Sequence, residues 1–134
     1  MPKSLKIVLG VLLGFVVWFG VATVGNLLIR HSMAGYAEAE PAMKFTLPML
    51  LARLTLGGVS SVAAGFVCAA ALRLATAAKF FASLLVLFFI PVHYSLWAKF
   101  PFWYHAVFLV SIAPLILLGA GLTRPIASQG EGAA

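Results

Sequence analysis

Two histidines toward the C-terminus, His93 and His105, have the residue type and spacing that chemistry in an apolar protein would need. Each stands six residues from Lys99, and the aromatic-rich segment between them joins two long apolar runs. If those runs form antiparallel helices, the two imidazoles lie at matching depth. Paired imidazoles on neighbouring helices are what a haem, metal or quinone site requires, whereas an interfacial belt requires only aromatic side chains. The pair therefore predicts either a ligand site or a pair of interfacial anchors.

Arg53 is the charged side chain that lies well inside an apolar run. It follows Phe45 by eight residues, which is about 12 Å along a helix axis. An arginine at the centre of a membrane helix costs about 2.5 to 3.5 kcal/mol on insertion scales. We expect its guanidinium either to reach the nearer membrane surface, as a long side chain can, or to bind an anion, a lipid phosphate or a carbonyl group.

Carboxylates are missing from every apolar run. The acidic residues are Glu38, Glu40 and Glu131, and there is no aspartate. Proton-driven membrane proteins usually depend on an acidic residue inside the membrane. This chain resembles the small multidrug exporters in size, and those proteins need a glutamate in the first helix. The first run of this chain has no glutamate. The pattern argues against proton-driven antiport, two-carboxylate hydrolysis and carboxylate-ligated di-metal chemistry. A single cysteine, Cys68, excludes an intramolecular disulfide.

The elements that position these residues must be membrane helices. The 134 residues are 63% hydrophobic and 9% charged, so polar side chains cannot cover the apolar surface in water. Four runs reach the length of a membrane span: residues 7–29, 45–72, 80–97 and 102–122. These runs lack the alternation of apolar and polar residues that is typical of the strands of a membrane barrel. The predicted fold is an all-α integral membrane protein, an antiparallel bundle of four transmembrane helices in one domain (1–126), with a disordered polar tail (127–134).

The basic residues indicate topology rather than a nucleic-acid partner. The net charge is +6, but lysines and arginines are scattered singly at the ends of the runs. The N-terminus, the second loop and the C-terminus carry five of them: Lys3, Lys6, Arg73, Lys79 and Arg124. The first and third loops carry three: Arg30, Lys44 and Lys99. The excess predicts that both termini are cytoplasmic, in a bacterial inner membrane.

Small residues predict where helices pack closely. Gly10 and Gly14 are four residues apart in the first run. The second run has a stripe of small residues at the same spacing: Gly57, Ser61, Gly65 and Ala69. Association in lipid depends on such close packing because acyl chains are as apolar as leucine. The stripe predicts either a seam inside the bundle or the seam of a homodimer.

Helix alternation places the polar residues in one half of the bilayer. The end of the first run and the start of the second face the same side as the end of the third and the start of the fourth. The residues that share this half are Asn26, Arg53, His93, Tyr94, Tyr104 and His105. The sequence therefore predicts one carboxylate-free polar layer, in the outer leaflet if the termini are cytoplasmic.

Three functions follow as hypotheses. The leading one is an accessory, assembly or scaffold subunit that packs in the bilayer against other membrane subunits or itself, without cofactor or catalysis of its own. The second is a redox protein that binds haem b, a metal or a quinone through His93 and His105. It resembles the four-helix b-type membrane cytochromes only in general form, with one possible ligand pair. The third is a small dimeric transporter or channel for a neutral or anionic solute, with Arg53 as its selectivity residue.

Overall fold

The computed structural model describes residues 1–123, and every regular element within them is a helix. The elements are α1 (Lys3–Ser32), α2 (Tyr36–Ala39), α3 (Leu47–Leu72), α4 (Ala75–Ser95) and α5 (Phe102–Gly121). Helices α1, α3, α4 and α5 are long and apolar enough to cross a membrane, in agreement with the four predicted runs. The tail predicted at 127–134 lies outside the described residues.

The helix boundaries differ from the predicted runs most clearly between α3 and α4. The runs left residues 73–79 as a connection, but only Arg73 and Leu74 connect the two helices. Arg73 takes the left-handed conformation, with φ of 52°, and the Leu74 N–H donates to the Ala69 carbonyl at 3.1 Å. Hydropathy begins the third run only after Lys79, whereas the backbone hydrogen bonding of α4 already includes this basic residue near the start of the helix.

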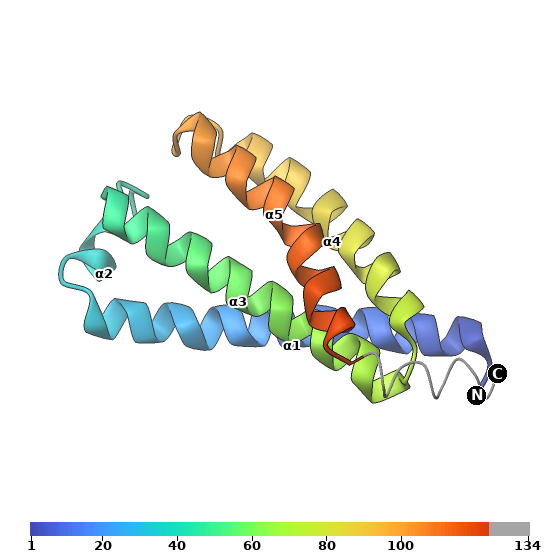
Figure 1. The fold of residues 1–134 in the computed structure, drawn as a ribbon. Coiled ribbons are helices and arrows are strands. Elements are labelled where there is room, and N and C mark those ends of the chain that lie inside the picture. Colours follow the sequence, from blue (N-terminus) through green and yellow to red (C-terminus); the bar gives the residue numbers. More distant parts are fainter. Residues whose placement is uncertain (124–134) are drawn as a thin grey trace.

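The four long helices form two antiparallel pairs, α1 with α3 and α4 with α5 (Figure 1). The pairs lie close together at the end of the molecule that holds the α3–α4 turn, which we call the closed end. They diverge toward the end that holds α2, which we call the open end (Figure 1). The molecule therefore has the shape of a V, with the short α2 beside the open end.

Glycines bring the helices together at the closed end. A Cβ atom on Gly65 of α3 would collide with the Ile116 carbonyl of α5, and one on Gly119 would collide with the Val62 carbonyl. The two backbones therefore touch where α3 crosses α5. The whole predicted stripe on α3 is buried within this chain, which places it in a seam of the bundle.

The glycines of α1 serve the same purpose against α4. A Cβ on Gly10 would lie 2.8 Å from that of Ala77, and one on Gly14 would lie 2.8 Å from the ring of Phe81. Both predicted packing motifs are thus occupied by helices of the same chain.

Trp18 marks the point where the two pairs begin to separate. Its Nε1 donates to the Ser61 hydroxyl at 3.0 Å, and this hydroxyl donates to the Gly57 carbonyl at 2.7 Å. The indole also packs against Phe89 and Phe108, with ring centroids 4.9 and 6.4 Å away. These rings fill the space between the pairs and form the floor of the open end.

Candidate functional site

A cavity of about 540 Å³ lies at the open end, between the two helix pairs. Its volume falls within the range of small-molecule sites in proteins. Apolar and aromatic side chains make most of the wall, with Trp18, Phe89 and Phe108 at the floor. The polar and charged wall residues are Thr23, Asn26, Arg30, Glu40, Arg53, His93 and Tyr104.

One side of α1 supplies the exposed residues of the cavity wall. The exposed wall residues of α1 are Phe19, Thr23, Leu27 and Arg30. Their spacing of four, four and three residues places them along one side of a helix. The exposed part of the cavity wall therefore runs lengthwise beside α1, on a flank of the bundle.

Arg53 is held inside the open end by neutral groups. Its Nη1 donates to the Tyr36 hydroxyl at 2.8 Å, and its Nε donates to the Tyr104 hydroxyl at 3.4 Å. The guanidinium carbon also lies 4.7 Å from the centre of the Phe45 ring, within the range of a cation–π interaction. The side chain therefore extends toward the end of the bundle that holds α2, and both of its predicted placements stay predictions.

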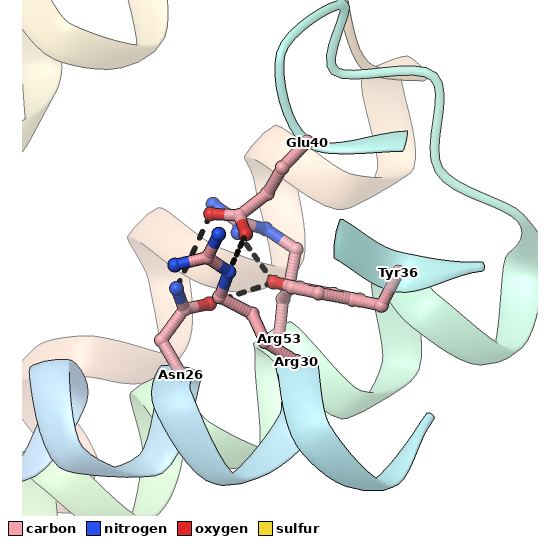
Figure 2. A network of polar contacts seen from close by, with 5 residues as sticks. All are labelled: Asn26, Arg30, Tyr36, Glu40 and Arg53. Carbon is pink, nitrogen blue, oxygen red and sulfur yellow. Dashed lines mark hydrogen bonds and ion pairs between the residues drawn. The ribbon is translucent and has the colours of Figure 1, made fainter. Parts of the chain in front are cut away.

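The contact of Arg53 with Tyr36 begins a polar network that Figure 2 shows from close by. The Tyr36 hydroxyl donates to Oδ1 of Asn26 at 2.8 Å, and the amide Nδ2 of Asn26 donates to Oε2 of Glu40 at 3.3 Å. Glu40 also forms an ion pair with Arg30, whose Nε lies 2.8 Å from its Oε1. Within residues 1–123, Arg53 has no carboxylate in ion-pair reach, so its charge is uncompensated.

The expectation of a carboxylate-free polar layer is wrong. Glu40 follows α2 directly and folds back over the cavity, where it lines the wall beside Asn26. Sequence reasoning treated residues 30–44 as a loop and did not place a carboxylate among the membrane residues. The missed signal is the four-residue spacing of Tyr36 and Glu40, which puts both side chains on one face of a single helical turn.

The two predicted histidines meet each other. Their Nδ1 atoms are 2.7 Å apart, and the rings are nearly perpendicular, at 82°. Both are buried, with 5% of His93 and 1% of His105 exposed. The Nε2 atom of His105 lies 3.4 Å from the Trp97 carbonyl oxygen. His93 lines the cavity, and His105 lies behind it.

This contact does not fit a haem between the rings. Two axial nitrogens stand on opposite sides of the iron, each about 2 Å from it, so they must be about 4 Å apart with the macrocycle between them. The observed distance of 2.7 Å leaves no such space. Among residues 1–123, no three histidine, cysteine or acidic side chains gather as the ligands of a metal ion would.

Tyr104 connects the arginine with the histidines, whereas Tyr94 stands apart. The Tyr104 ring stacks on the His93 ring, with centroids 6.2 Å apart, while its hydroxyl accepts from Arg53. Tyr94 is 82% exposed and does not line the cavity. Tyr94 therefore does not share the cavity with the other predicted residues, because an equal depth along the bundle does not give an equal direction around the helix.

The predicted residues that line the cavity together are Asn26, Arg53, His93 and Tyr104. They come from all four long helices, so the site exists only when the whole bundle has formed. No family model, curated protein or solved structure matches this chain. The geometry of the cavity is therefore the basis for a functional conclusion.

Proposed function

We propose that this protein is a small integral membrane protein that binds an amphiphile without transforming it. The polar head of the amphiphile lies beside Arg53, and its apolar tail lies between the α1–α3 pair and the α4–α5 pair. The observation that carries the proposal is the half-open cavity, which has aromatic walls at one end and charged walls at the other.

The polarity of the wall changes along the cavity as an amphiphile requires. Trp18, Phe89 and Phe108 offer an apolar floor to a tail. At the other end, Arg30 and Glu40 neutralise each other and Arg53 contributes one positive charge. A head with one negative charge, or with a strong hydrogen-bond acceptor, complements that balance.

The position of the exposed wall residues favours a ligand that comes from the bilayer. Phe19 and Leu27 lie in the exposed part of the wall along α1, and both face outward in the apolar part of a helix that is long enough to span a membrane. A ligand can enter sideways from the acyl chains past such residues.

The proposed setting is a bacterial inner membrane with both termini on the cytoplasmic side. The excess of lysine and arginine at the termini and at the α3–α4 turn supports this orientation. The closed end then lies in the inner leaflet, and the cavity lies in the outer leaflet with Arg53 near its headgroups.

The cavity and the helix packing support the redox, transporter and accessory-subunit hypotheses to different degrees. A quinone falls within the proposed ligand class, because it is an amphiphile whose carbonyls accept hydrogen bonds. The transporter hypothesis retains Arg53 as a wall residue of the cavity. The accessory-subunit hypothesis loses its main support, because the glycine stripes are filled by this chain.

Fluorescence of Trp18 gives a direct test. Of the three tryptophans, Trp18 lines the cavity, whereas Trp97 and Trp103 are exposed. In a variant with Trp97→Phe and Trp103→Phe, we expect phosphatidylglycerol with brominated tails to quench Trp18 saturably in detergent. Because hydrogen bonds to charged groups contribute about 1.5 to 3 kcal/mol, Arg53→Gln should weaken binding about tenfold or more.

The matched control is Arg73→Gln, which removes an arginine from the other end of α3, outside the cavity. It should leave the lipid affinity unchanged. Quenching that rises linearly with lipid content, and equally in the Arg53→Gln and Arg73→Gln proteins, would overturn the proposal.

A further inference from the structure

The hydrogen bonds around the two histidines determine which ring nitrogens carry protons. A carbonyl oxygen only accepts, so Nε2 of His105 must be the donor to the Trp97 carbonyl. When the His105 ring carries this single proton, its Nδ1 has a lone pair and accepts. The Nδ1 of His93 must therefore carry the proton that joins the two rings at 2.7 Å.

One acceptor remains without a donor. Because Nδ1 of neutral His93 is protonated, its Nε2 has a lone pair and no proton. This nitrogen has no hydrogen-bond partner among residues 1–123, although the side chain is 95% buried and lines the cavity. The nitrogen atom itself retains some accessible surface beside the cavity, so a hydrogen-bond donor in the cavity can reach it.

Arg53, on the same wall of the cavity, offers hydrogen-bond donors and so needs an acceptor. It has donors for an anionic oxygen, and its charge has no carboxylate partner in the described residues. Tyr104 separates the two groups, with its ring stacked on His93 and its hydroxyl bonded to Arg53. A head that satisfies both groups carries an anionic acceptor and a hydrogen-bond donor about one aromatic ring apart, and a hydroxyl is a donor that adds no second positive charge beside Arg53.

We infer that the site selects a phosphodiester lipid with one negative charge and a hydroxyl in its headgroup. The phosphate oxygen accepts from Arg53, and the headgroup hydroxyl donates to Nε2 of His93. This inference rests on the proposed function, because it assigns the head of the amphiphile that the cavity binds. Phosphatidylglycerol has the required chemistry: a single negative charge and a glycerol head whose hydroxyls extend beyond the phosphate.

The test compares two lipids of equal charge, one with hydroxyls in its headgroup and one without. Phosphatidylglycerol and phosphatidylethanol with the same brominated tails carry the same charge, but the ethyl head has no hydroxyl. In the Trp18 quenching assay, we expect phosphatidylglycerol to bind about three- to tenfold more tightly, as one neutral hydrogen bond would produce. His93→Phe should abolish this preference, and Tyr94→Phe, at an exposed neighbouring position, should retain it.

Each outcome bears on a different claim. Equal saturable binding of both lipids would overturn the assignment of the headgroup and leave the proposed function in place. Binding of neither lipid would overturn the proposed function as well. A preference that persists in folded His93→Phe protein would show that His93 is not the acceptor. If His93→Phe does not fold, the comparison of the two lipids on the protein that retains His93 decides alone.

Discussion

The closed end and the open end of the bundle contain the same four helices and differ in the size of the residues between them. At the closed end, Gly65 and Gly119 allow the backbones of α3 and α5 to touch. At the open end, Trp18, Phe89 and Phe108 separate the pairs and leave a cavity beyond them. Lipid adds little hydrophobic drive to helix association, so the side chains at each crossing determine how far apart the helices stand.

The largest expected effect comes from disrupting the close contact at the closed end. Gly65→Val places a side chain where the Ile116 carbonyl lies, and backbone cannot move aside as a flexible side chain can. We expect a loss of about 3 kcal/mol or more in stability, at the upper end of overpacking effects. Unfolding in mixed micelles, followed by circular dichroism, measures it. Gly20→Val is the control, because a Cβ at Gly20 meets nothing within 4 Å.

A smaller effect is expected at the floor of the open end. Trp18→Phe removes the donor to the Ser61 hydroxyl and reduces the volume between the pairs. Losing a buried hydrogen bond and part of an aromatic ring should cost about 2 kcal/mol. The same unfolding assay measures it, with the exposed Trp97→Phe as the matched change. Equal stability of the two variants would show that Trp18 does not hold the pairs in place.

The sequence predicted the four long apolar helices and four of the residues that line the cavity. Hydropathy identified the four spans because their length and apolar content are local properties. Alternation of the spans correctly grouped Asn26, Arg53, His93 and Tyr104. It could not distinguish His93 from its neighbour Tyr94, because the direction of a side chain around the helix depends on how the pairs cross.

The part of the site contributed by α2 was not predictable from hydropathy. Tyr36 is completely buried and Glu40 lines the cavity, yet both belong to a polar stretch between two spans. Their placement depends on bonds with Asn26, Arg30 and Arg53, which are distant in sequence or on other elements. Contacts of this kind appear only when the packing of α1 against α3 is known.

The smallest expected effect concerns this polar network. Glu40→Gln removes the charge that pairs with Arg30, while keeping the shape of the side chain. Because Arg30 and Glu40 are partly exposed, we expect a loss of only about 0.5 to 1 kcal/mol in stability. The exposed Glu38→Gln is the matched control and should change stability by less. Thermal unfolding at low and high salt measures both, and a loss that is insensitive to salt would argue against an electrostatic origin.

The contact between His93 and His105 also has a consequence for how the chain enters the bilayer. The two residues belong to consecutive helices, α4 and α5, which a short connection at residues 96–101 joins into a hairpin. Their Nδ1 bond therefore needs no residue from α1 or α3. A hairpin released into lipid ahead of its final partners would already hide these two facing nitrogens from the acyl chains. The imidazole pair thus satisfies its own two facing nitrogens within the α4–α5 hairpin.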